Sequence, residues 1–158
     1  MTTRPEHIID AALRRGVQIV TAESCTGGLL TGALTSVPGS SAVVERGFIT
    51  YSNAAKQEDL GVPATLIAAH GAVSEEVAMA MAEGALAASP ATLAISVTGI
   101  AGPGGSEHKP EGRVCFGLAD ARGTRVETVE FGALGRDRVR AAAVTHALGM
   151  LAAALGDG

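Results

Sequence analysis

Two short segments of the sequence carry side chains that could act as a nucleophile and as a base. In the first, residues 21–28 read Thr-Ala-Glu-Ser-Cys-Thr-Gly-Gly, at the expected junction of a strand and a helix. The free N–H groups of a helix start favour negative charge, so a nucleophile there would have its oxyanion stabilised. Gly27 and Gly28 would let a ligand approach the backbone closely. Ser24 and Thr26 could equally be ordinary helix caps, and this alternative stays open.

The second segment, residues 51–56, reads Tyr-Ser-Asn-Ala-Ala-Lys and leads from an expected strand into a short helix. Arginine accounts for ten of the twelve basic residues, leaving only Lys56 and Lys109. A buried lysine can lose its proton and act as a base, which arginine cannot do. This favours Lys56 as a general base, with a solvated lysine on a helix surface as the alternative. Tyr51, the only tyrosine, could be an ordinary residue of an edge strand.

A third segment, residues 98–105, reads Thr-Gly-Ile-Ala-Gly-Pro-Gly-Gly after the most apolar stretch of the chain. Successive N–H groups in such a loop can bind a phosphate, although a flexible surface loop is the commoner outcome. The segment is neither a P-loop nor a dinucleotide fingerprint. The four histidines and two cysteines lack metal-ligand spacing, so we expect no metal and no other cofactor.

Alternating helices and apolar strands must position these segments. A helix is expected over residues 5–15, with Ile8, Ile9, Ala12 and Leu13 on its buried face and Gly16 as its end. Ser74 is expected to cap another helix, with Glu75 and Glu76 in its first turn. Further helices are expected from residue 29 to Val37 and over 54–60, 63–70 and 139–155; strands over 17–21, 43–51 and 93–98; and a hairpin formed by 113–118 and 126–131.

This pattern predicts one domain over residues 1–158, a three-layer α/β/α fold with a mixed sheet. In such folds ligands bind beyond the carboxyl ends of the strands. The segments 23–28, 51–56 and 99–105 all leave strands there, so we expect them to form one site.

Composition excludes some functions. The net charge of −4 and the 3% of aromatic residues argue against a nucleic-acid partner. No apolar run reaches the roughly 20 residues of a membrane-spanning helix, and the N-terminus does not read as a signal peptide. We therefore expect a cytoplasmic protein with a small-molecule partner and no membrane partner. A homo-oligomer is expected for a small alanine-rich α/β domain.

Seven motifs, in order and at compatible spacings, resemble the C-terminal domain of the competence/damage-inducible CinA proteins. That domain also occurs alone as nicotinamide-nucleotide amidohydrolase. The motifs cover nearly the whole chain: TAESCTGG at 21–28, PGSS at 38–41, GFITYSNAAK at 47–56, LGV at 60–62, HGAVSE at 70–75, TGIAGPGG at 98–105 and KPEGRV at 109–114.

The resemblance implies that the protein deamidates nicotinamide mononucleotide to nicotinic acid mononucleotide and ammonia. It implies Ser24 as the nucleophile, Lys56 as its general base and Tyr51 as the helper of Lys56. The chain departs from the family at Glu111, where a small apolar residue is usual, and at 135–138, where the family has a shorter Gly-Asp-Arg. Residues expected to bind the substrate are Glu23, Cys25, Thr26, Gly27, Gly28, Ser40, Ser41, Asn53, Gly99, Ala101, Gly102 and Gly104.

Two alternatives stay open. Cys25 rivals Ser24, because thiols at helix starts readily become thiolates. A non-catalytic nucleotide-binding or interaction module could use the same fold. A short-chain dehydrogenase is set aside, because Tyr51 and Lys56 are five residues apart rather than four and no glycine fingerprint follows the first strand.

Overall fold

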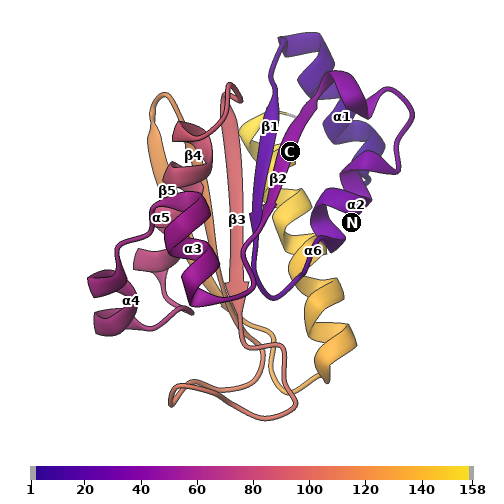
Figure 1. Ribbon diagram of the computed structural model, residues 1–158. Helices are drawn as coiled ribbons and strands as arrows, with labels where there is room; N and C mark the ends of the chain where they lie inside the picture. The colour runs from indigo at the N-terminus through magenta and orange to yellow at the C-terminus, as the bar shows by residue number, and fades with distance from the viewer. Residues whose placement is uncertain (1–2, 157–158) are drawn as a thin grey trace.

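A five-stranded mixed sheet forms the centre of the protein in a computed structural model that describes residues 3–156 (Figure 1). The strand order is β2-β1-β3-β4-β5. The first three strands run parallel to one another, whereas β4 and β5 form an antiparallel hairpin beside β3. The strands are β1 (Ile19–Glu23), β2 (Val44–Ile49), β3 (Leu93–Gly99), β4 (Arg113–Asp120) and β5 (Gly123–Glu130).

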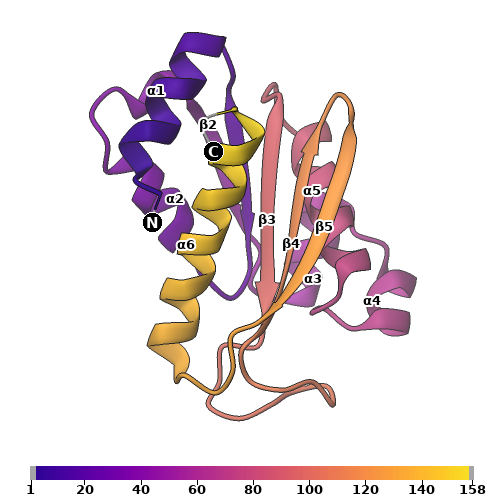
Figure 2. The same cartoon turned by 180° about the vertical axis from the view of Figure 1, so that it is seen from behind.

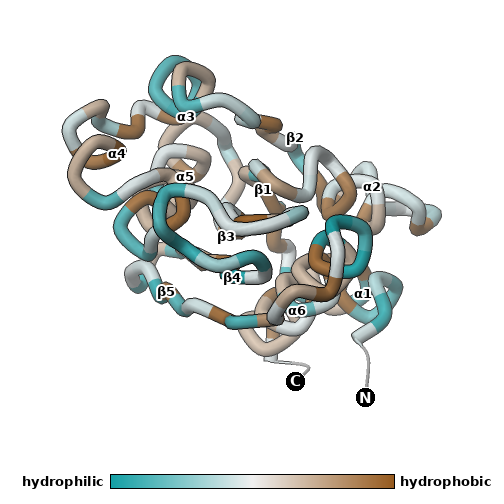
Figure 3. The backbone as a smooth tube through the Cα atoms, turned by 90° about the horizontal axis from the view of Figure 1, so that it is seen from below, coloured by the Kyte–Doolittle hydropathy of each residue, from teal (hydrophilic) through white to brown (hydrophobic). Residues whose placement is uncertain are grey.

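Helices cover both faces of this sheet. Figures 2 and 3 show α1, α2 and α6 on one face and α3, α4 and α5 on the other. The predicted three-layer α/β/α fold with a mixed sheet is therefore confirmed. The helices are α1 (Pro5–Arg15), α2 (Leu29–Thr35), α3 (Asn53–Leu60), α4 (Ala64–His70), α5 (Glu75–Ala87) and α6 (Arg136–Ala154), with a short 3₁₀ helix, η1 (Ser40–Ala42).

The central strand β3 is buried on both faces, as its apolar sequence predicts. Its alternating side chains separate two cores. Ile95 packs on the α6 side with Phe116 and Leu151. Ala94 packs on the α5 side with Met81. The small Ala94 suits the close approach of α5.

The carboxyl ends of β1, β2 and β3 meet at one edge of the sheet, because these strands are parallel. The loops that follow them gather at the lower end of the molecule in Figure 1. This arrangement confirms that segments 23–28, 51–56 and 99–105 come together.

Close packing of α3 on α5 fixes the helix that carries Lys56. A Cβ on Gly84 of α5 would lie only 2.0 Å from the carbonyl oxygen of Leu60, so no larger residue fits there. Ser52 caps α3 by accepting a hydrogen bond from Ala55 N–H. Ser74 caps α5 in the same way, as predicted.

Several sequence predictions need correction. The hairpin strand predicted over 126–131 spans Gly123–Glu130, and the helix predicted from residue 29 to Val37 ends at Thr35. The first strand begins at Ile19 rather than Val17, because Val17 N–H still bonds to Ala12 O in the turn that ends α1. Leu13 is 47% exposed, since it lies at the margin of the helix face centred on Ile8 and Ala12. The second strand, predicted over 43–51, spans only Val44–Ile49, and α6 begins at residue 136 rather than 139. The last difference affects the site directly.

No helix in the described part of the chain combines the length and apolar character needed to span a membrane.

Candidate active site

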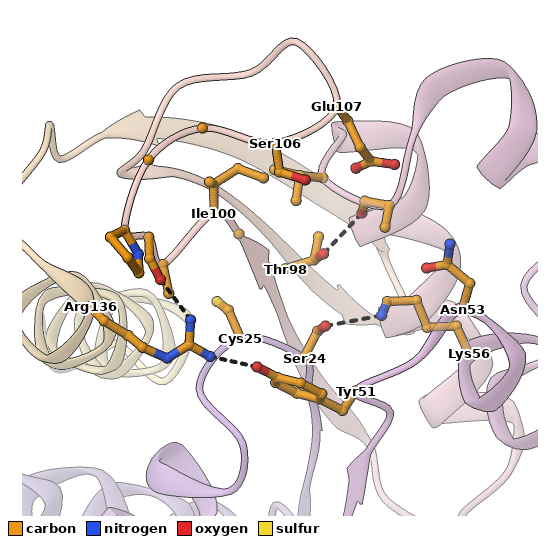
Figure 4. A pocket seen from close by; sticks show the side chains of 18 residues that line it. Ser24, Cys25, Tyr51, Asn53, Lys56, Thr98, Ile100, Ser106, Glu107 and Arg136 are labelled. Atoms are coloured by element: carbon orange, nitrogen blue, oxygen red, sulfur yellow. Dashed lines mark hydrogen bonds between the residues drawn. The ribbon is translucent and has the colours of Figure 1, made fainter.

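A cavity of about 320 Å³ opens where β1, β2 and β3 end (Figure 4). Sites for small molecules span roughly 300–1,000 Å³, so this cavity suits a small ligand. Its walls are the segment after β1, the start of α3, the turn before α5, the loop between β3 and β4, and one side chain from α6. The lining residues are Ser24, Cys25, Tyr51, Asn53, Lys56, Ala72, Val73, Arg136 and residues 98–107.

Ser24 and Lys56 are in direct contact within this cavity. The two atoms Lys56 Nζ and Ser24 Oγ lie 2.9 Å apart and form a hydrogen bond. Lys56 Nζ also donates to the carbonyl oxygen of Thr50, at 2.9 Å. Ser24 is held by its N–H, which donates to Val97 O in β3. Two segments that are 32 residues apart thus place a hydroxyl against an amine.

Burial changes the acid–base behaviour of this amine. Lys56 is only 1% exposed, and this desolvation lowers its pKa below the ordinary lysine value of 10.5. The negative charges of a Cys25 thiolate and of Glu107 would act in the opposite direction. A neutral lysine can donate to Thr50 O and still use its lone pair to accept the proton of Ser24. The pair therefore has the geometry and the chemistry of a nucleophile and its base.

Cys25 lines the cavity but is a poor nucleophile. Burial raises the pKa of its thiol from 9.0 to about 12, so the thiol stays protonated near neutral pH. Its carbonyl oxygen accepts a hydrogen bond from Arg140 Nε at 3.1 Å, which fixes the backbone of the turn. This environment favours Ser24 over Cys25 as the nucleophile.

Glu23 is buried beneath the turn and does not reach the cavity. Its carboxylate accepts hydrogen bonds from the N–H groups of Gly28, Leu30 and Thr31, and from the hydroxyls of Thr26 and Thr31. The free N–H groups at the start of α2, expected to face a ligand, are thus satisfied from within. Glu23 is therefore the internal cap of α2, and its contact with the substrate stays a prediction.

This cap predicts a large effect on stability. Glu23→Ala would leave several buried donors unsatisfied, each costing about 1–3 kcal/mol. We expect the free energy of unfolding to fall by about 3 kcal/mol or more in urea denaturation. Glu6→Ala is the matched control, since Glu6 lies in the first turn of α1 and, among residues 3–156, its carboxylate pairs with Arg4 at the surface; we expect a loss of about 1 kcal/mol or less. Equal effects of the two substitutions would contradict this role of Glu23.

The far side of the cavity is formed by Arg136, at the start of α6. Its guanidinium donates from Nη1 to Gly102 O at 2.7 Å and from Nη2 to the hydroxyl of Tyr51 at 2.5 Å. Tyr51 is 60% exposed. In the part of the chain that the structure describes, its hydroxyl bonds to Arg136, whereas Lys56 bonds to Ser24 and Thr50. The structure therefore pairs Tyr51 with Arg136 instead of with the lysine that it was predicted to assist.

Glu111 connects this side of the cavity to the rest of the fold. One carboxylate oxygen accepts from Gly104 N–H at 2.7 Å and the other from Gly135 N–H at 2.9 Å. The first contact holds the glycine-rich loop, and the second holds the residue that precedes Arg136. Glu111, where the chain departs from the family pattern, thus supports the glycine-rich loop.

The structure brings together some of the sequence-predicted site residues and separates others. The cavity is lined by Ser24, Lys56 and Tyr51, and by the expected substrate-binding residues Cys25, Asn53, Gly99, Ala101, Gly102 and Gly104. The others do not line it, and their contacts with the substrate stay predictions: Glu23, Thr26, Gly27, Gly28, Ser40 and Ser41. The hydroxyl of Ser40 instead donates a hydrogen bond to the carbonyl oxygen of Thr35, the last residue of α2.

Four polar residues of the cavity lie outside the set predicted from the sequence: Thr98, Ser106, Glu107 and Arg136. Arg136 was placed before the predicted helix start, and a helix beginning three residues earlier is what orients it. Thr98, which donates to Ala72 O, ends the buried strand, and a hydroxyl at that position was a usable signal. Glu107 is exposed in the turn closed by Ser106 and Lys109, and the sequence holds no signal that this turn lies at the cavity.

Comparison with known proteins shows to which family the chain is related. The family model of the CinA C-terminal domain matches residues 1–155. The Escherichia coli K12 protein named nicotinamide-nucleotide amidohydrolase PncC is 50% identical over 144 residues, which cover 90% of this chain and 87% of that protein. A CinA-like protein of Chlorobium phaeobacteroides is 58% identical over 123 residues, which cover 75% of this chain. This chain spans only 29% of that longer relative.

Solved structures agree with the sequence comparison. The competence/damage inducible protein CihA of Agrobacterium tumefaciens matches with a TM-score of 0.87 and 46% identity, covering 99% of each chain. The competence damage-inducible protein A of Klebsiella pneumoniae matches with a TM-score of 0.93 and 38% identity, covering 96% of this chain and 94% of that one. By sequence and by structure, the chain belongs to the CinA C-terminal domain family.

Proposed function

We propose that this protein hydrolyses the carboxamide of nicotinamide mononucleotide to nicotinic acid mononucleotide and ammonia, with Ser24 as nucleophile and Lys56 as general base. The observation that carries the proposal is the 2.9 Å contact between Lys56 Nζ and Ser24 Oγ inside a cavity of ligand size. The substrate is supported by the 50% identity to the E. coli protein named for this activity.

The acylation half-reaction follows from this contact. Neutral Lys56 takes the proton of Ser24 as Oγ attacks the carboxamide carbon, and a tetrahedral oxyanion forms. The lysine ammonium then gives its proton to the departing amide nitrogen, which leaves as ammonia. The acyl group remains on Ser24 as an ester. In the second half, Lys56 takes a proton from water, the hydroxide attacks the ester, and the serine oxygen leaves and is reprotonated by Lys56.

Oxyanion stabilisation is assigned to the residues directly after the nucleophile. Glu23 occupies the N–H groups of Gly28, Leu30 and Thr31, whereas the N–H groups of Cys25 and Thr26 bond to no other residue within 3–156. We assign these two groups as the oxyanion donors. One such donor is worth on the order of 3 kcal/mol of transition-state stabilisation.

The phosphate of the substrate is assigned to the Arg136 side of the cavity. A guanidinium has five N–H donors, so Arg136 can bind a phosphate while it keeps its contacts to Tyr51 and Gly102. The N–H groups of the glycine-rich loop would add further donors. In this orientation the carboxamide lies toward Ser24 and the phosphate toward the start of α6.

The direct test is an assay of purified protein with nicotinamide mononucleotide. We expect ammonia and nicotinic acid mononucleotide to appear in equal amounts, the first detected by a coupled assay and the second by chromatography. Binding of the nucleotide without turnover would reject the proposal in favour of a nucleotide-binding module. The control is a reaction without protein.

The support of the loop by Glu111 predicts an effect on substrate binding. Glu111→Ala removes both contacts that hold the loop and the residue before Arg136, so we expect the KM to rise about tenfold with kcat changed less. The matched control is Glu130→Ala, an exposed acid of β5 that pairs with Arg113, for which we expect an unchanged KM. A KM for the Glu111 variant within twofold of that of the wild type would contradict this role.

A further inference from the structure

Among the residues that line the cavity in the described part of the chain, one is acidic: Glu107. Its carboxylate forms no hydrogen bond or ion pair with residues 3–156, whereas the carboxylates of Glu23 and Glu111 accept from backbone N–H groups. Figure 4 shows Glu107 on the Lys56 side of the cavity and Arg136 on the opposite side of Ser24. The cavity therefore has a guanidinium at one end and, on the Lys56 side, the exposed carboxylate of Glu107, with the Lys109 ammonium close to it, beside Gly71.

The loop that carries Glu107 is held in an uncommon conformation. Glu107 and His108 both have positive φ, 53° and 63°, which is unfavourable for residues other than glycine. A pair of backbone hydrogen bonds between Ser106 and Lys109 closes this turn. Lys109 Nζ then donates to Val73 O at 2.5 Å, which ties the turn to the segment before α5. These contacts place the Glu107 carboxylate at the cavity, beside Gly71.

We propose that Glu107 recognises the positive charge of the pyridinium ring that bears the carboxamide. The inference rests on nicotinamide mononucleotide being the ligand of this cavity. The ring nitrogen of that nucleotide is bonded to ribose and carries a positive charge, and the carboxamide is attached to the same ring. The proposal places the carboxamide carbon at Ser24 Oγ, the ring on the side that Glu107 faces, and the phosphate dianion toward Arg136.

Charge complementarity of this kind also favours the catalytic state of Lys56. In the free protein, the negative charge of Glu107 raises the pKa of Lys56 and so opposes the effect of its burial. A cationic ring bound between them would offset the charge of Glu107. The substrate itself would then help Lys56 to become neutral, whereas a ligand with an uncharged ring would not.

A neutral analogue of the same shape separates charge recognition from packing. The 1,4-dihydro form of nicotinamide mononucleotide keeps the carboxamide, ribose and phosphate but has an uncharged ring. Dissociation constants for both nucleotides are measured by calorimetry on the Ser24→Ala protein, with and without Glu107→Gln. Glu58→Gln is the matched control, since Glu58 is an exposed acid on the same helix as Lys56 and does not line the cavity.

We expect Glu107→Gln to raise the dissociation constant of the cationic nucleotide about tenfold and that of the dihydro form less than twofold. Glu58→Gln should change neither. Equal changes for the two nucleotides, or none for the cationic one, would overturn the proposal. The proposed function is tested separately: if the wild type releases no ammonia while the tenfold difference is observed, the hydrolase proposal fails and the charge recognition stands.

Discussion

Ser24→Ala is expected to reduce ammonia release from nicotinamide mononucleotide by about 10⁴-fold or more, with binding of the nucleotide retained. The substitution removes the attacking oxygen and leaves the cavity, Lys56 and the oxyanion donors in place. Losses of this size are typical of replaced serine nucleophiles. The measurement is kcat from initial rates, together with the dissociation constant of the nucleotide for the variant.

The neighbouring thiol provides the comparison. Cys25→Ala is expected to keep kcat within about tenfold of the wild type, because a thiol whose pKa is raised to about 12 is not the nucleophile. Some loss of stability is expected, since Cys25 is part of the apolar core. Activity that survives in Ser24→Ala and disappears in Cys25→Ala would reverse the assignment.

Lys56→Arg is expected to reduce kcat by about 10³-fold, although the positive charge is retained. Arginine cannot give up its proton, and general-base catalysis contributes roughly 10²–10⁴-fold. Lys109→Arg is the matched control, because it makes the same exchange at the other lysine of the chain, and an arginine can still donate to the carbonyl oxygens of His70 and Val73 that hold the turn carrying Glu107. We expect it to change kcat less than fivefold. Full activity of Lys56→Arg would exclude Lys56 as the base.

The pH dependence of the wild type follows from the same lysine. Burial lowers the pKa of Lys56, so the neutral amine is populated at a lower pH than that of an ordinary lysine. The value of kcat/KM should rise with pH as Lys56 loses its proton and level off below 10.5, the ordinary lysine pKa. A kcat/KM that falls as the pH rises toward 10.5 would contradict a neutral lysine base.

Hydrophobic patterning was sufficient to predict the layers of the fold. The buried strand β3 and the capped helix α5 are local features, decided by side chains within a few residues of each other. The ends of elements depend on tertiary contacts instead. Val17 N–H bonds to Ala12 O in the turn after α1, which delays the start of β1. Helix α6 begins at Arg136, directly after Gly135, whose N–H donates to the carboxylate of Glu111. Boundaries of this kind cannot be read from periodicity.

The site was predictable to the extent that it follows strand ends. Ser24, Lys56 and the loop at 99–105 meet because three parallel strands end at one edge. One feature depends on contacts between residues far apart in the sequence, which no local pattern shows: Lys109 donates to the carbonyl oxygens of His70 and Val73 and so holds the loop that carries Glu107 at the cavity. Glu23 turns inward to cap α2 through partners only three to eight residues away, and the residue types of this segment do not decide between that cap and a contact with the ligand. The cytoplasmic location and the homo-oligomer stay predictions.

The most direct test of a serine-bound intermediate is partition of the reaction by hydroxylamine. The amine competes with water for an acyl-enzyme, so we expect the wild type to form the hydroxamate of nicotinic acid mononucleotide in a share that grows with hydroxylamine concentration. Ser24→Ala should form none above the uncatalysed background. Ammonia release accompanied at every hydroxylamine concentration by the acid alone would contradict attack by Ser24.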